Sequence, residues 1–432
     1  MLQAVFNAFK IPDLRRRIIF TVLMLLVFRV VAHIPVPGVD LAKLDQLLKQ
    51  NQLLGMLNLF SGSALRQFSV AAMGVYPYIT ATIIFQLLGP IIPRLEELGK
   101  EGEQGRATLN RYQHIATVPL ALLQAFGQCQ LMKSQGVLSG FGLFDGSTAL
   151  RSIAILASMT AGSMFLVWLG ELITENGIGQ GVSIIIFGGI VANLPASVGN
   201  LATGNSVTQN IAGTVIFLVL GLITIVGIVL INEGQRRIQV NYARRVRGNR
   251  MYGGQTTHIP LKVNSAGMIP LIFAVSIMVF PGYIANLFTA SDRAWLREPA
   301  NFLAKVFDAN SLQYQIIYFF MVVGFTYFYT VVVFQQQNIA ENLQKNGGFI
   351  PGIRPGTPTN IYLMKVLTRI TLVGAIFLGV VAVMPWIAAK MTGVQTLFLS
   401  STSLLIVVGV AIDTMRQLEA QLLMRHYEGF IK

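Results

Sequence analysis

The sequence predicts an all-α membrane protein, and three observations support this fold class. Hydrophobic residues make up 53% of the 432 residues, and mean hydropathy is +0.62. Charged residues make up only 12%, where a soluble domain has about a quarter. Ten apolar stretches approach the roughly 20 residues that a helix rising about 1.5 Å per residue needs to cross the hydrocarbon layer.

The apolar stretches predict ten transmembrane helices in two groups of five. The first group lies near residues 18–34, 69–92, 112–132, 152–170 and 181–199. The second lies near residues 211–231, 265–287, 313–334, 366–388 and 396–413. An even number of spans places both termini on the same side of the membrane.

The distribution of lysine and arginine predicts which side that is. The two termini and the loops on their side contain 21 of these residues, whereas the opposite loops contain 9. Because positive charge is enriched in cytoplasmic loops, both termini and the long loops 232–264 and 335–365 are expected in the cytoplasm. Arg29 and Arg369 fall within spans. Arg29 lies near the outer end of the first span, and we expect its side chain to extend to the membrane surface.

The outer loop after the first span contains an apolar segment, FSGSALRQF, at residues 60–68. Two interpretations are open from the residues alone: a half-helix that folds back into the membrane, or a surface loop with a few apolar side chains. The span that follows, 69–92, is interrupted. Gly74 and Pro77 are expected to bend its first turns, and Thr80, Thr82 and Gln86 indicate that one face meets other helices or a cavity.

The two long inner loops differ in composition. In 232–264, six arginines surround alternating Ile238, Val240 and Tyr242, which favours an exposed hairpin with a basic tip. Such a tip suits RNA, acidic partners or anionic lipid. The loop 335–365 is rich in glycine and proline and is expected to form a rigid, irregular tip that displays Arg354 for a partner, rather than a plain linker.

Several function classes lack support in the sequence. The best approach to a phosphate-binding loop, residues 127–134, has a methionine in place of the second glycine. The four histidines show no metal-ligand spacing, and no nucleophile and base stand out, so neither an enzyme nor a cofactor is expected. Carboxylates occur only at span ends, which argues against an ion-coupled transporter of a small solute. The charge pattern instead favours a membrane pathway lined by neutral residues. The small-solute transporter, and a scaffold that anchors ribosomes, remain the alternative functions.

Six stretches in order along the chain carry a family resemblance: residues 74–86 (GVYPYITATIIFQ), 177–190 (GIGQGVSIIIFGGI), 235–245 (QRRIQVNYARR), 258–270 (HIPLKVNSAGMIP), 347–356 (GGFIPGIRPG) and 402–413 (TSLLIVVGVAID). They identify the chain as a member of the SecY family, the pore subunits of the bacterial Sec protein translocon. The resemblance implies two pseudo-symmetric, inverted halves of five helices, residues 1–200 and 201–432. It also implies a channel for unfolded secretory proteins in the bacterial cytoplasmic membrane, which releases membrane-protein segments sideways.

The resemblance also assigns residues to roles. The pore ring would comprise Ile79, Ile83, Ile186, Ile190, Ile272 and Ile406, here called the ring isoleucines. A plug that blocks the outer funnel at rest as a short helix would comprise Phe60, Ser61, Gly62, Ser63, Ala64, Leu65, Arg66, Gln67 and Phe68, here called the plug segment. Thr80, Thr82, Gln124 and Ser276 would lie at a lateral gate, with Gln124 and Ser276 as polar contacts across it.

Partners follow from the same resemblance. The ribosome, through its RNA, or the motor ATPase SecA would dock on the cytoplasmic arginines Arg236, Arg237, Arg244, Arg245, Arg247, Arg250 and Arg354. SecE and SecG are the implied small partner subunits, and signal peptides and unfolded polypeptides are the implied substrates. The loop between the fourth and fifth spans has Asn176 where the family often has a basic residue, so docking there is not expected on charge alone.

Overall fold

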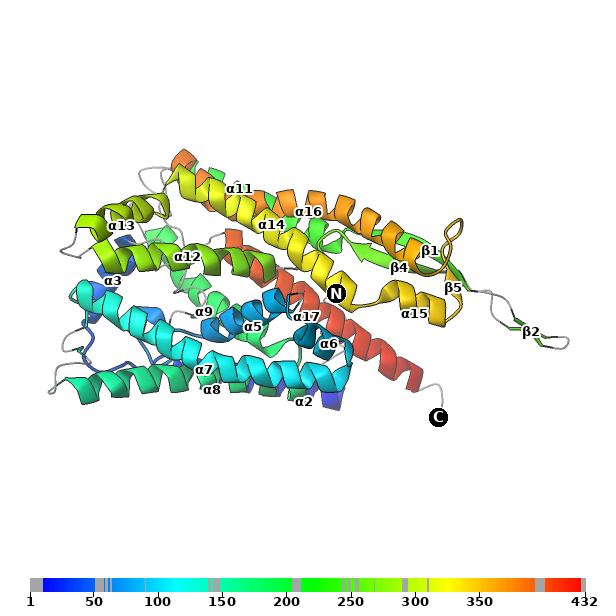
Figure 1. Cartoon of the computed structure of the whole chain (residues 1–432). Helices are drawn as coiled ribbons and strands as arrows, with labels where there is room; N and C mark the ends of the chain where they lie inside the picture. Colours follow the sequence, from blue (N-terminus) through cyan, green and yellow to red (C-terminus); the bar gives the residue numbers. More distant parts are fainter. Residues whose placement is uncertain are drawn as a thin grey trace.

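The protein is described from a computed structural model, which is mostly helical (Figure 1). It describes residues 11–50, 58, 61–62, 64–89, 91–138, 141–142, 148–203, 211–242, 245–247, 250–252, 256–267, 269–289, 294–308, 311–392 and 401–428. The helices of the first part are α2 (Pro12–Val31), α3 (Leu41–Gln50), α5 (Tyr76–Leu88), α6 (Pro93–Lys100), α7 (Glu103–Ser134), α8 (Ala149–Asn176) and α9 (Gly181–Thr203). Those of the second part are α11 (Ile211–Glu233), α12 (Ile269–Thr289), α13 (Ala294–Val306), α14 (Leu312–Gln336), α15 (Ile339–Lys345), α16 (Thr357–Thr392) and α17 (Ser401–Glu428).

Every stretch predicted as a span contains a helix. Within the described residues, four helices are long and apolar enough to cross a membrane by length and composition, and they lie in α7, α8, α14 and α16. The bent pair α5 and α6 makes a fifth candidate, and α9, α11 and α12 contribute shorter apolar helices. The chain is therefore a mostly helical, multi-pass membrane protein.

The interrupted span near 69–92 is helical over only part of its length. Residues 70–75 form turns, in which Gly74 adopts a positive φ of 58°, and α5 begins at Tyr76 with Pro77 in its first turn. A left-handed residue followed by proline suits a helix start and not a helix interior. After Leu88 the chain bends by 106° into α6, so the apolar length counted from the sequence includes a turn at each end of a short helix.

The helices fall into two groups by contact. Helices α2 and α5 to α9 contact one another, and helices α11 to α17 contact one another. The main contacts between the groups join α9 to α17 and both α5 and α7 to α12. In Figure 1 the first group lies in the lower part of the view and most of the second in the upper part, with α17 running along the boundary.

The two long loops form one structural unit beyond the helices. Strand β1 (Gln235–Tyr242) pairs antiparallel with β4 (Thr256–Lys262), which confirms the predicted hairpin in 232–264. The glycine-rich loop 335–365 is not simply irregular, because it contains α15 and a short strand, β5 (Gly348–Phe349), which pairs with β1. Near the tip of the hairpin, β2 (Arg245–Arg247) pairs with β3 (Arg250–Tyr252). Apolar side chains from both loops share a core with α14 and α16: Ile238, Val240, Leu261, Phe334, Leu343, Ile350, Leu363 and Leu367.

Candidate functional site

Five of the six ring isoleucines come together at the boundary between the two helix groups. Ile186 and Ile190 of α9, Ile272 of α12 and Ile406 of α17 belong to one buried cluster, and Ile79 of α5 packs against it. The exposed fractions of the four cluster members range from 1% for Ile406 to 7% for Ile272, whereas Ile79 is half-buried. Ile83 is also buried, at 3%, although it is not a member of that cluster. Four helices far apart in the sequence thus deliver stiff, β-branched side chains to one buried apolar cluster, whose isoleucines are here called the constriction.

A cavity of about 430 Å³, lined by both polar and apolar residues and here called the polar cavity for its charged and amide side chains, adjoins this constriction toward the end of the bundle that bears the β1 sheet. Its lining comes from both helix groups, with Gln180 and Ser183 from the start of α9 and Asp413 and Arg416 from α17. Arg416 also contacts Glu233 at 2.8 Å, so its charge is paired at the cavity edge. The other lining residues are Gly179, Asn232, Lys262, Asn264, Ser265, Ala266, Gly267, Ile269, Tyr329, Val333, Leu405, Gly409, Val410, Thr414 and Gln417.

Most described residues of the plug segment are buried, and the segment lies beside the ring isoleucines of α9. Its only described helix is a single 3₁₀ turn at Leu65–Gln67 and not a longer α-helix. Ala64, Leu65 and Phe68 have no exposed surface, and Ser61 donates a hydrogen bond to the carbonyl of Asn58 while its hydroxyl accepts one from the Leu65 amide. Phe60 and Ser63 lie outside the described residues.

The plug segment touches α9 through two glycines. A Cβ atom added to Gly62 would lie 3.0 Å from the Cα of Gly189 and 2.6 Å from the ring of Phe28. A Cβ added to Gly189 would overlap the Cα of Gly62. Backbone therefore meets backbone here, and Gly189 stands directly beside the ring residue Ile190. The close approach seats the plug segment immediately against the constriction.

Helix α9 orders these features along its axis. Ser183 lines the polar cavity, Ile186 joins the apolar constriction one turn later, and Gly189 contacts the plug segment one turn after that. Helix α17 repeats part of the order, since Asp413 and Val410 line the cavity and Ile406 reaches the constriction. The cavity, the apolar constriction and the plug segment are therefore neighbours along α9, where Gly189 lies between the ring residues Ile186 and Ile190.

The expected gate residues lie where α5 and α7 meet α12, but their bonds differ from expectation. Gln124 of α7 donates to the Thr80 hydroxyl of α5 at 3.3 Å, and this bond links two helices of the same group. The Ser276 hydroxyl donates to Ile272 of its own helix, and the Thr82 hydroxyl donates to Tyr78 of its own helix. A hydrogen bond does join the two groups at this boundary: the Tyr76 hydroxyl donates to the Ser276 carbonyl at 3.2 Å.

The arginines expected to dock partners lie on the β unit. Arg236 and Arg237 are exposed on β1, and Arg354 is exposed in the turn after β5. Arg245, Arg247 and Arg250 belong to β2 and β3, which project furthest from the helices in Figure 1. Arg244 lies outside the described residues. The sheet order β4, β1, β5 joins both loops into one surface.

Sequence reasoning missed Tyr76 and Gly189 as site residues and gave Arg29 a different role. Arg29 was expected to extend to the membrane surface, yet its Nη1 donates to the Gly62 carbonyl at 3.0 Å. An ionisable residue inside a span is a functional candidate by default, and that general rule could have drawn attention to Arg29. No local pattern marks Tyr76 or Gly189 as a contact between distant segments.

Comparisons with known proteins identify the family of this chain. A family model described as SecY matches residues 69–415. The chain is 43% identical to the protein translocase subunits SecY of Mycobacterium bovis and Thermotoga maritima; it is covered completely in both cases, and 100% and 98% of the relatives are covered.

Solved structures with similar folds include a protein-conducting channel, at a TM-score of 0.60 and 16% identity, with 96% of each chain covered. They also include Sec61 in a canine ribosome-channel complex, at a TM-score of 0.58 and 16% identity, again with 96% of each chain covered. These likenesses support the fold, and the sequence matches over the full length establish the family. The chain belongs to the SecY family of protein translocase subunits.

Proposed function

We propose that this chain is the central channel subunit of a Sec translocon, conducting unfolded secretory proteins across the membrane and releasing membrane-protein segments sideways into it. Its family consists of protein-conducting channels and not of enzymes. The observation that carries the proposal is the order along α9, where Ser183 at a polar cavity, Ile186 at an apolar constriction and Gly189 at a buried segment follow at one-turn intervals.

The ring isoleucines form the seal of this channel. An apolar constriction excludes water and ions by dewetting, but it offers no chemical preference among the side chains of a passing polypeptide. The plug segment closes the outer side of the constriction, and the polar cavity is the cytoplasmic mouth that receives the substrate. Displacement of the plug segment and separation of the ring isoleucines together open the path.

The boundary between α5 and α7 on one side and α12 on the other is the lateral gate. A signal peptide carries an apolar segment of about 7 to 15 residues, which gains about 25 cal/mol for each Å² that it moves from water into lipid. That gain biases the gate toward its open state when the hydrogen bond from Tyr76 to the Ser276 carbonyl is weak enough to break. The gate thereby selects substrates by hydrophobicity.

The overall assembly follows from the same proposal. The ten helices form two inverted halves, residues 1–200 and 201–432, in the bacterial cytoplasmic membrane, with both termini in the cytoplasm. The contact groups and the excess of positive charge on the terminal side support this arrangement. SecE and SecG bind the helices, and SecA or the ribosome docks on the arginine-bearing loops, as the ribosome-channel complex of Sec61 illustrates for that protein.

Site-specific crosslinking tests the proposal. A photo-crosslinking residue is placed at Ile83 or Ile272, and a secretory chain is stalled midway through export in proteoliposomes that contain SecE and SecA. We expect crosslinks to successive residues of the stalled chain from both positions. The matched control is Ile223 of α11, which is 57% exposed on the outside of the bundle and should give none. Absence of crosslinks from Ile83 and Ile272, with the partners active on another translocon, would favour the small-solute transporter.

A further inference from the structure

The plug segment is held by a side chain from within the first span. Arg29 of α2 donates from Nη1 to the Gly62 carbonyl at 3.0 Å, across 33 residues of sequence. The neighbouring Phe28 is only 2% exposed and packs against the same glycine. A guanidinium is costly to bury without partners, so its placement against a backbone carbonyl stabilises the closed position of that carbonyl.

A second arginine fastens the other end of the plug segment. Arg66 points away from the buried cluster, and its Nε lies 3.1 Å from Oδ1 of Asp45 on α3. The Arg66 amide also donates to the side chain of Asn58 at 2.9 Å. One arginine contact is made at Gly62, before the 3₁₀ turn, and the other by Arg66 within it, so the plug segment is attached to α2 and to α3 at once.

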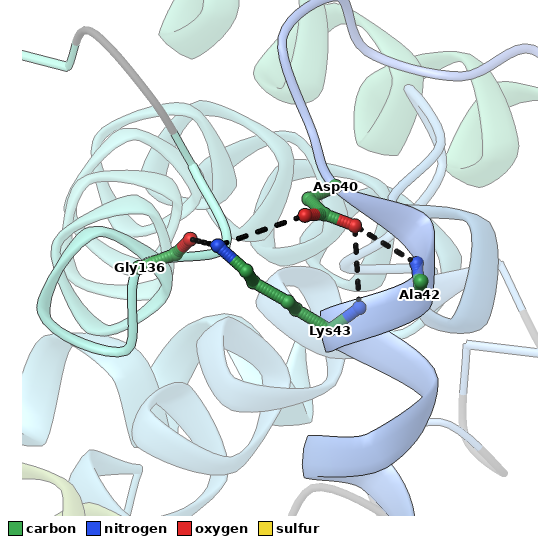
Figure 2. A network of polar contacts seen from close by, with 4 residues as sticks. All are labelled: Asp40, Ala42, Lys43 and Gly136. Atoms are coloured by element: carbon green, nitrogen blue, oxygen red, sulfur yellow. Dashed lines mark hydrogen bonds and ion pairs between the residues drawn. The ribbon is translucent and has the colours of Figure 1, made fainter.

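Helix α3 is itself anchored, which makes it a firm support for Asp45. Figure 2 shows the start of α3, where Oδ1 of Asp40 accepts from the amides of Ala42 at 3.1 Å and Lys43 at 3.3 Å. Lys43 Nζ donates to the Gly136 carbonyl beyond the end of α7 at 3.4 Å, and the Asp40 amide donates to the Val137 carbonyl at 2.9 Å. Leu44, in the next turn, is fully buried in the same apolar cluster as Leu65 and Phe68.

We propose that Arg29 and Asp45 are positioning residues that form a two-point latch, which holds the plug segment closed against the constriction. This inference rests on the proposed function, because it assumes that the plug segment is the outer seal of the channel. Arg29 is the stronger point, since it lies within the span and is part-buried. The Asp45–Arg66 pair is the weaker point, because its side chains are 32% and 54% exposed and such pairs contribute little in water.

The chemistry of the latch makes it reversible. When the plug segment moves away, the hydrogen bond from Arg29 to the Gly62 carbonyl breaks. Water that enters the opened channel then accepts from the Arg29 guanidinium in place of that carbonyl. Arg29 has a hydrogen-bond acceptor in both states: the plug segment when the channel is closed and dry, and water when it is open and wet. It therefore favours these two discrete states over positions between them. An apolar residue at position 29 would not distinguish them.

The test measures how often the plug segment leaves its seat. Ala64, which is fully buried, is replaced by cysteine in a chain whose own Cys129 is replaced by alanine, and a membrane-impermeant maleimide is added from outside. Arg29→Gln should raise the labelling rate about tenfold, since hydrogen bonds to charged groups are among the stronger ones. Asp45→Asn should raise it about twofold to threefold. Arg15→Gln, an exposed arginine at the other end of α2, is the matched control and should leave it unchanged.

Two further variants separate positioning from folding. Arg29→Lys keeps a charged donor and should restore most of the slow labelling. The double variant Asp45→Arg with Arg66→Asp exchanges the two charges and should be labelled more slowly than either single variant. Labelling of Arg29→Gln at the unsubstituted rate, or no recovery in these two variants, would overturn the latch. Replacement of residues 60–68 by a flexible linker tests the proposed function separately, since unchanged ion conductance there would refute the plug itself whatever Arg29 does.

Discussion

In the proposed channel, the axis and the lateral gate are closed by different kinds of contact. Along the axis, the glycines Gly62 and Gly189 bring backbone against backbone, and the buried ring isoleucines fill the space beside them. At the gate, the bond between the groups is the one from Tyr76 to the Ser276 carbonyl, and Oε1 of Gln124 is buried without a hydrogen-bond partner among the described residues.

The difference indicates which closure yields first. Close apolar packing is lost only when whole segments separate, and the free energy of that packing grows with the area buried. The net contribution of a hydrogen bond to stability is only about 0.5 to 1.5 kcal/mol, and a buried polar atom without a partner lowers the stability of the closed gate further. Opening the gate sideways should therefore cost less free energy than opening the channel along its axis. A channel that admits apolar segments before it transports the rest of the chain requires this order.

The largest expected effect comes from Gly189→Leu, which attacks the close packing directly. The new side chain would occupy the position of the Gly62 backbone, and overpacking of this kind costs about 1 to 3 kcal/mol. We expect the closed population of the plug segment to fall by about tenfold to a hundredfold, measured as ion conductance without substrate in planar bilayers. Gly221→Leu on α11 is the matched control, because a Cβ there meets no atom within 4 Å. Equal conductance in the two variants would contradict the glycine contact as part of the seal.

A smaller effect is expected from Ile406→Ser, which tests the constriction alone. In a chain whose plug segment is replaced by a linker, a hydroxyl among the ring isoleucines should let water persist and raise ion conductance about several-fold. Ile155→Ser in α8 provides the control, since Ile155 is 2% exposed but belongs to a different apolar cluster. Both substitutions remove buried apolar volume and should lower the free energy of unfolding by a similar amount, about 2 to 4 kcal/mol. A leak in both variants would therefore show general destabilisation of the protein and not a specific role of the ring isoleucines.

Much of the helical framework could be predicted because its determinants are local. A run of about 20 apolar residues specifies a span in any context, and alternation at Ile238, Val240 and Tyr242 specifies a strand. The amphipathic helix α3 was also within reach, since Leu41, Leu44, Leu47 and Leu48 recur with helical spacing, although it was not predicted.

The contacts that define the site could not be predicted in the same way. Tyr76 and Ser276 are 200 residues apart, and neither their spacing nor their residue types predict a hydrogen bond between them. The two-residue strand β5 owes its conformation to pairing with β1, because so short a stretch carries no periodicity of its own. Gly189 reads as an ordinary small residue of an apolar helix until the fold brings Gly62 beside it. The family resemblance supplied the ring isoleucines and the plug segment, whereas the structure supplied what holds them.

The smallest expected effect comes from Tyr76→Phe, which removes the hydrogen bond between the helix groups at the gate. The ring is kept, so packing changes little, and a loss of about 1 kcal/mol should shift the gate toward its open state about fivefold. The measurement is the efficiency of the disulfide between cysteines placed on α5 and α12, which should fall, together with faster insertion of weakly apolar signal peptides. Tyr314→Phe on α14 is the matched control, because Tyr314 is buried and its hydroxyl has no hydrogen-bond partner among the described residues. If both variants behave alike, or if Tyr76→Phe leaves the disulfide unchanged, the gate is held by packing as the axis is, and the distinction between the two closures fails.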